Sequence, residues 1–305
     1  MIRTVTGDIT RQQLGHTMCH EHFIFDLARI RHDDFSFVKS VDEVVPEVEL
    51  MMGLGIRSAF EMTTNDMGRN VVQLKELSER TGLQIVASTG FYLTQYHPDF
   101  IASASVRDIA DIFVRDLTVG VGDTGIKAGL IGEIASSPER FEGYEKKILL
   151  AAARAAVETG AAVSTHTGPK TVVETVETLL AEGVKPDKII IGHQDLVDDH
   201  DYHMSVLKYG VNIAFDTCGK VAYMADEARA RNALKIVEAG YGDHLLLSND
   251  VSRKTYYVSH GGTGYTGVMN KVVPLMREYG VKDTDIVKML WDNPARIADN
   301  ENWKD

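Results

Sequence analysis

Two histidines separated by one residue, His20 and His22, lie in a short apolar stretch near the start of the sequence. If this stretch is a β-strand, alternate side chains point to the same face, so the two imidazoles project together and Glu21 points away. Two neighbouring neutral imidazoles at the end of a strand provide half of a divalent metal site. The alternative is that the two histidines are unrelated, and the pair alone does not decide between these interpretations.

The elements that would supply further ligands recur along the chain as short β-rich runs that alternate with amphipathic helical stretches. The predicted strands are residues 17–23, 58–64, 85–91, 128–134, 161–167, 189–195, 212–217 and 245–250. Near-continuous apolar runs of this kind are typical of parallel strands that are covered on both faces. The predicted helices are residues 41–54, 70–81, 144–159, 171–182, 226–239 and 270–279.

Eight strands that alternate with helices in a chain of 305 residues predict one domain, residues 1–305, with the α/β fold of a (β/α)8 TIM barrel. A doubly wound open sheet is the competing architecture. It usually needs fewer strands, and its nucleotide-binding fingerprint, G-x-G-x-x-G after the first strand, is absent from the sequence. In a barrel, chemistry is located at the C-terminal ends of the strands, so residues at those positions are the candidates for function.

Residues of metal-binding types stand at the predicted ends of five of the eight strands. They are His20, His22, Glu133, His166, His193 and Asp250. Taken singly, Glu133 could be a surface carboxylate and Asp250 a helix cap. His166 and His193 could be hydrogen-bonded imidazoles of the core. The joint placement is more specific than any single residue, and it predicts a metal site at the C-terminal end of the barrel.

This pattern resembles the amidohydrolase superfamily, and specifically the phosphotriesterase family. The resemblance covers essentially the whole chain in order, and it is carried by the motifs CHEHFIFDL, EMTTNDMGRN, VASTGFY, KAGLIGEIASS, VSTHTG, IGHQD, FDTCGK, SNDVSRK and DNPARI. It is closest to the branch of phosphotriesterase homology proteins. Most of the wider family bridges two metals with a carboxylated lysine on the fourth strand, whereas this sequence has Glu133 there, as that branch does. The glutamate needs no carbon dioxide but is shorter, so triesterase activity does not transfer on this resemblance.

The resemblance implies a site for two divalent cations that share Glu133 and a bridging hydroxide. His20, His22 and Asp250 would bind the more buried ion, and His166 and His193 would bind the more exposed one. Asp250 would be the catalytic residue that shuttles the proton of the hydroxide, and the exposed ion would polarise the carbonyl or phosphoryl oxygen of the substrate. Imidazole and carboxylate ligands make Zn²⁺ the first choice, with Mn²⁺, Co²⁺ and Fe²⁺ as alternatives.

Four residues near the predicted catalytic end are candidates for binding the substrate: Tyr92, Lys220, Arg253 and Tyr256. Lys220 and Arg253 follow the seventh and eighth predicted strands, and two cations in an acidic protein could clamp a phosphate or carboxylate. The alternative is a solvated lysine and a structural arginine. Tyr92 matches a tyrosine that faces the substrate in related lactonases, and the alternative for it is a structural role. Tyr256 lies close in sequence to Arg253.

The composition is that of an ordinary globular protein, with 44% hydrophobic and 25% charged residues. The formal net charge of −12 argues against nucleic acid or an anionic membrane as a partner. Two distant cysteines, Cys19 and Cys218, predict buried free thiols and a cytoplasmic location. No apolar run approaches the length of a membrane span. His32, His200 and His203 lie among aspartates and are predicted to be solvated.

Three hypotheses for function follow from these residues. The first is hydrolysis of an ester bond, in a lactone, carboxylic ester or phosphate ester of a small anionic molecule. The second keeps the fold and the metals but cleaves an amide, as in an N-acyl amino acid. The third is a non-catalytic metal-binding barrel, which the complete set of candidate ligands disfavours. The resemblance also implies a homodimer.

Overall fold

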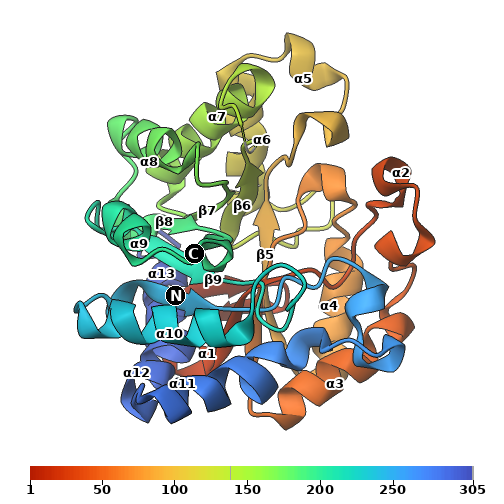
Figure 1. The fold of residues 1–305 in the computed structure, drawn as a ribbon. Helices are drawn as coiled ribbons and strands as arrows, with labels where there is room; N and C mark the ends of the chain where they lie inside the picture. Colours follow the sequence, from red (N-terminus) through yellow and green to blue (C-terminus); the bar gives the residue numbers. More distant parts are fainter. Residues whose placement is uncertain (138, 304–305) are drawn as a thin grey trace.

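The computed structural model describes residues 1–137 and 139–303. Eight parallel strands follow one another in chain order around a barrel, with the helices outside it (Figure 1). The strands are β3 (Thr17–Glu21), β4 (Ser58–Glu61), β5 (Gln84–Thr89), β6 (Leu130–Ala135), β7 (Val163–His166), β8 (Ile189–Ile191), β9 (Asn212–Phe215) and β10 (Leu245–Leu247). This arrangement confirms the predicted (β/α)8 TIM barrel.

The barrel closes at a seam between its first and last strands. The backbone N–H of Asp250, in the loop after β10, donates to the carbonyl of His20 in β3 at 3.1 Å. Ser248 Oγ lies 2.7 Å from the same carbonyl oxygen. Glu21 also links the two ends of the barrel. Its Oε1 accepts a hydrogen bond from the backbone N–H of Asn249 at 2.9 Å and one from Ser248 Oγ at 2.8 Å. These contacts fix the position of His20 relative to Asp250.

Helices surround the barrel and connect its strands. They are α1 (Arg11–Leu14), α2 (Ala28–Arg31), α3 (Val45–Gly53), α4 (Val71–Thr81), α5 (Phe100–Ser103), α6 (Val106–Thr118), α7 (Gly143–Thr159), α8 (Val172–Ala181), α9 (His200–Leu207), α10 (Asp226–Glu238), α11 (Val273–Tyr279), α12 (Asp283–Val287) and α13 (Asn293–Ala298). The six predicted helices correspond to α3, α4, α7, α8, α10 and α11. Among the described residues, no helix has both the length and the apolar character needed to cross a membrane.

Helices α6 and α9 lie outside the predicted pattern. Helix α6 begins with a capping box, in which Ser105 Oγ accepts from the backbone N–H of Asp108 at 3.2 Å and Asp108 accepts in return from that of Ser105 at 2.9 Å. Helix α9 is short and rich in histidine and aspartate, so the sequence shows no clear helical spacing of apolar residues there. The prediction that His203 is solvated is wrong, because this residue is buried in α9 and its Nε2 lies 2.8 Å from the carbonyl oxygen of Gln194.

The barrel interior is filled with apolar side chains and capped where the strands begin. The cap is a hairpin of β1 (Ile2–Thr4) and β2 (Gly7–Ile9), and the backbone N–H of Val5 joins it to β5 by donating to the carbonyl of Ile85 at 2.9 Å. The interior cluster contains Ile2, Ile9, Leu14, Cys19, Phe60, Met62, Val86, Leu130, Ala162, Ile190, Ala214 and Leu246. Both cysteines are buried and free, as predicted. This apolar plug leaves the C-terminal ends of the strands as the place where a site can open.

All the observed barrel strands except β6 end earlier than the predicted ones. Strand β8 ends at Ile191 and β10 ends at Leu247, so His193 and Asp250 belong to loops and not to strands. Both residues adopt left-handed backbone conformations, with φ of 58° and 49° respectively. Such conformations are uncommon in non-glycine residues and are concentrated at functional sites.

Candidate metal centre

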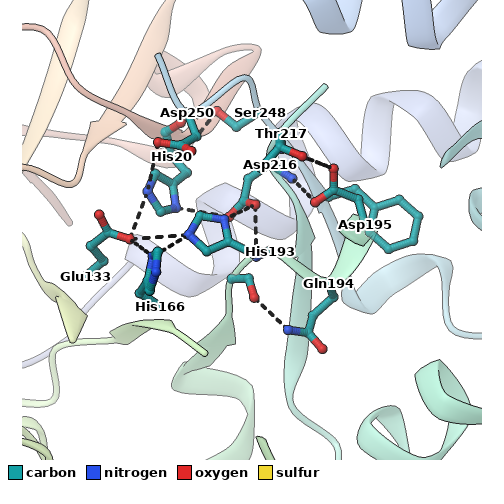
Figure 2. A network of polar contacts seen from close by, with 12 residues as sticks. His20, Glu133, His166, His193, Gln194, Asp195, Asp216, Thr217, Ser248 and Asp250 are labelled. Carbon is teal, nitrogen blue, oxygen red and sulfur yellow. Dashed lines mark hydrogen bonds and ion pairs between the residues drawn. The ribbon is translucent and has the colours of Figure 1, made fainter. Parts of the chain in front are cut away.

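The predicted ligands meet at the C-terminal end of the barrel, and Figure 2 shows five of them pointing toward one another. His20 lies in β3 with His22 just beyond its end, Glu133 lies in β6, and His166 is the last residue of β7. Strand pairing shifts register in β3 at residues 18–21 and in β6 at residues 131–134. Irregularities of this kind re-aim side chains, and these two occur in the strands that carry His20 and Glu133.

The carboxylate of Glu133 lies at the centre of the group and is 2% exposed. Its Oε2 lies 3.0 Å from His166 Nδ1 and 3.5 Å from His193 Nε2. The same oxygen lies 3.4 Å from His20 Nε2, and Oε1 lies 3.4 Å from His22 Nε2. One carboxylate therefore contacts both pairs of histidines, as a ligand shared between two cations would.

Asp216, directly after β9, contacts two of these imidazoles at Nδ1, on the side away from Glu133. It is completely buried, and its Oδ1 lies 2.8 Å from His193 Nδ1 while its Oδ2 lies 3.0 Å from His20 Nδ1. Burial would raise the pKa of Asp216, but the two histidines lower it. A carboxylate behind Nδ1 favours the tautomer in which Nε2 carries a free lone pair. Sequence analysis missed this role, although Asp216 ends a predicted strand.

The Asp216→Asn variant should bind zinc about 10- to 100-fold more weakly than the wild type. The amide can accept from one imidazole, but its NH2 group then faces the N–H of the other. Competition with a chromophoric chelator measures the affinity. Asp201→Asn, an exposed position in α9, is the matched control. Equal zinc affinity in Asp216→Asn and wild type would contradict the orienting role.

His22 is oriented by a separate chain of hydrogen bonds. Its Nδ1 lies 3.0 Å from Thr63 Oγ1, and the Thr63 hydroxyl donates to Glu61 Oε1 at 2.5 Å. Burial raises the pKa of Glu61 to about 7. Because Thr63 donates to Glu61, it accepts from His22 Nδ1–H, which again leaves Nε2 facing Glu133.

The donor atoms fit divalent cations. The Nε2 atoms of His20 and His22 are buried, and neither has a hydrogen-bond partner within the described part of the chain. A buried polar atom without a partner is costly, so its placement calls for a ligand. Three groups of donors lie close enough together to hold an ion. Two consist of predicted ligands alone, His20 with His22 and Glu133, and Glu133 with His166 and His193, and the third joins His20 and His193 to Asp216. Imidazole with carboxylate is a donor set that suits zinc and its first-row neighbours.

The buried charges also favour cations. Burial alone would raise the pKa of Glu133, but His20 and His166 beside it lower that pKa well below its usual value. Burial would lower the pKa of His20, but Glu133 and Asp216 raise it to about 10. The carboxylates thus require compensating positive charge, which protons on the imidazoles or bound metal ions can supply.

Asp250 divides its two oxygens between the histidines and a lysine. Its Oδ1 lies 3.2 Å from His22 Nε2 and 4.0 Å from His20 Nε2. Its Oδ2 accepts a hydrogen bond from Lys220 Nζ at 2.5 Å. Burial would raise the pKa of Asp250, but Lys220 and then His22 lower it. Lys220 therefore contacts a candidate metal ligand directly.

A cavity of about 150 Å³ opens over these residues. Tyr92 and Lys220, two of the predicted substrate contacts, line it together with His166. The Tyr92 hydroxyl lies 3.2 Å from His166 Nε2. Burial raises the pKa of Tyr92 well above its usual value, so the phenol is neutral and can donate.

The other two predicted substrate contacts lie outside the cavity lining. The centroid of the Tyr256 ring is 4.8 Å from Lys220 Nζ, so the ring stabilises the position of the lysine through a cation–π contact. The Arg253 side chain is 40% exposed, and its Nε lies 3.6 Å from Asp33 Oδ2. Arg31, from the end of α2, lines the cavity instead. The sequence around Arg31 carries no pattern that would have identified it.

Several known proteins are similar to this chain in sequence and in fold. The profile of the Phosphotriesterase family matches residues 1–298. The phosphotriesterase homology protein of Escherichia coli is 32% identical over 93% of this chain and 97% of its own length. An N-acetyltaurine hydrolase of Dictyostelium discoideum is 30% identical over 85% of this chain and 74% of its own length.

Solved structures agree with the sequence matches. The crystal structure of the Escherichia coli protein, with phosphate in its active site, superposes with a TM-score of 0.91 and 31% identity, covering 94% of this chain and 99% of that one. A lactonase from Listeria monocytogenes gives a TM-score of 0.91 and 30% identity, covering 98% of each chain. The chain therefore belongs to the phosphotriesterase family, whose members include hydrolases of phosphoesters and of lactones.

Proposed function

We propose that the protein hydrolyses a lactone or another ester of a small anionic molecule with the help of two divalent cations, zinc in the first instance. The observation that carries this proposal is the placement of Glu133 between two pairs of histidines, with contacts of 3.0 to 3.5 Å. The ligands would be His20, His22, Glu133, His166, His193 and Asp250. Two cations bound there would activate water and withdraw charge from the oxygen of the scissile bond.

The side chains of the site have distinct roles in this reaction. Asp250 accepts a proton at Oδ1, the oxygen that faces His22, because Lys220 occupies Oδ2. The neutral Tyr92 hydroxyl donates a hydrogen bond at the rim of the cavity, where it also contacts His166. The cavity of about 150 Å³ suits a small substrate, and Lys220 lines it while its charge is paired with Asp250.

A second candidate reaction is amide hydrolysis. It is favoured by the similarity to an N-acetyltaurine hydrolase, whose named substrate is an anionic amide. Both reactions need an activated water and a polarised carbonyl, so the geometry of the ligands serves either one. Preference between them depends on the leaving group, which a substrate panel resolves.

The test begins with metal content on protein purified without chelator, together with hydrolysis of lactones and of N-acylated amines. We expect about two ions per chain, loss of activity on chelation and recovery with zinc or manganese. Turnover of lactones over amides would support the ester reaction, and the reverse would support the amide reaction. Full activity in protein stripped of metal would refute the proposal.

A further inference from the structure

Two basic side chains line the cavity over the candidate metal ligands, and they differ in how their charge is balanced. Lys220 is paired with Asp250 at 2.5 Å. Arg31 donates from Nη1 to the backbone carbonyl of Ser252 at 2.8 Å, and a carbonyl carries no net charge. Within residues 1–137 and 139–303, no carboxylate forms an ion pair with Arg31. Its positive charge is therefore available to a molecule in the cavity.

The position of Arg31 is fixed from both sides of the α2 segment. Its bond to Ser252 ties the end of α2 to the loop after β10. Arg29, in the same helix, donates to the backbone carbonyl of Tyr96 at 2.9 Å and ties α2 to the loop after β5. Arg29 is exposed and does not line the cavity. A guanidinium held in this way loses little entropy when it binds a ligand.

The carboxylates that line the cavity contact other side chains and do not neutralise the charge of Arg31. Glu133 and Asp250 are the carboxylates that line it, and both face the histidines. One nitrogen of Arg31 is used by Ser252, and the remaining N–H groups can form paired hydrogen bonds with an oxyanion. Neither Tyr92 nor Lys220 offers this planar, bidentate geometry.

We propose that Arg31 binds a phosphate or carboxylate group on the substrate and so determines specificity for anionic esters. This inference rests on the proposed hydrolysis of an ester and names the residue that recognises the charged end. It replaces Arg253, the arginine favoured by the sequence, whose side chain pairs with Asp33 outside the cavity lining.

The test compares Arg31→Met with Arg253→Met, an arginine outside the cavity lining, on three matched γ-lactones that carry a phosphate, a carboxylate or a hydroxyl group. In Arg31→Met, kcat/KM for an anionic lactone should fall by about 10- to 100-fold, mainly through KM. The value for the hydroxyl lactone should change by less than about 2-fold, as should all values in Arg253→Met. Arg31→Lys should recover part of the loss because it keeps the charge but not the bidentate geometry.

The pattern of losses identifies the anion. A loss confined to the phosphate lactone, or to the carboxylate lactone, assigns Arg31 to that group. An equal loss on all three lactones would show a merely structural role and overturn the inference, as would unchanged kinetics in Arg31→Met.

A binding measurement separates this inference from the proposed reaction. Methylphosphonate and propionate, which cannot be hydrolysed, are titrated calorimetrically into metal-loaded wild type and Arg31→Met. If the wild type cleaves no ester but Arg31→Met binds one of these probes about 10-fold more weakly, the proposed reaction fails and the anion site stands. Equal affinities in the two proteins would overturn the anion site whatever the reaction.

Discussion

Replacing Glu133 with glutamine should abolish hydrolysis and lower the metal content below two ions per chain. The carboxylate contacts both pairs of histidines, at 3.0 Å from His166 and 3.4 Å from His22, so its loss affects both cations at once. An amide is a weak ligand, and its NH2 group would face an imidazole Nε2. We expect kcat/KM to fall by more than about 1,000-fold, measured with metal content on the same preparation.

The matched control is Glu142→Gln, because the Glu142 side chain is 69% exposed and pairs with Arg140 at 3.2 Å, away from the candidate ligands. Circular dichroism of both variants establishes that the barrel is folded. A folded Glu133→Gln protein with two ions per chain and wild-type turnover would show that Glu133 is not a shared ligand.

Replacing Arg229 with methionine should destabilise the protein by about 3 to 5 kcal/mol. Arg229 is fully buried, and it donates from Nε to Asp195 Oδ2 at 2.6 Å and from Nη1 to Asp226 Oδ1 at 2.9 Å. Methionine fills much of the volume but leaves Asp195 buried without its cation. The backbone N–H of Asp216 donates to Asp195 at 3.2 Å, so the loss extends toward the metal centre (Figure 2).

The free energy of unfolding is measured by denaturant titration of the metal-loaded proteins. Arg231→Met serves as the control, since Arg231 is exposed on the same helix, and it should change stability by less than about 0.5 kcal/mol. If the two variants lost the same small amount, the buried ion pairs of Arg229 would contribute little to the fold.

The sequence was sufficient for the barrel because eight apolar runs alternate with amphipathic stretches, the pattern of a parallel sheet covered by helices. It was less informative about where those strands end. His193 and Asp250 follow apolar runs directly, so the pattern extends the strands over them, whereas both lie in loops with left-handed backbones. The spacing of apolar residues predicts which residues are buried. It does not predict where a strand ends and a turn begins when the first residue of the turn is itself buried.

Helix α6 and helix α9 show two different reasons for a missed element. The capping box of Ser105 and Asp108 marks the start of α6 and is readable from the sequence. Helix α9 offers no comparable signal, because the burial of His203 depends on the carbonyl of Gln194, which lies in a separate segment of the chain.

The candidate ligands were accessible to sequence analysis because their residue types are rare at the ends of apolar strands. Their supporting residues were not. Asp216 and Thr63 act through hydrogen bonds to imidazole Nδ1 atoms, and those contacts exist only once the strands are side by side. Arg31 and Arg253 illustrate the same limit, since the folded positions of helix α2 and of the loop after β10 decide which guanidinium lines the cavity.

The seam of the barrel has a consequence for how this enzyme can evolve. The closing bond to His20 is donated by the backbone N–H of Asp250, and every residue type except proline has that group. The carboxylate of Asp250 is not part of the seam, which Glu21 and Ser248 reinforce independently. A substitution at position 250 that tolerates the left-handed backbone can therefore alter the chemistry without opening the barrel, so a lineage can lose or exchange its reaction there while the fold persists.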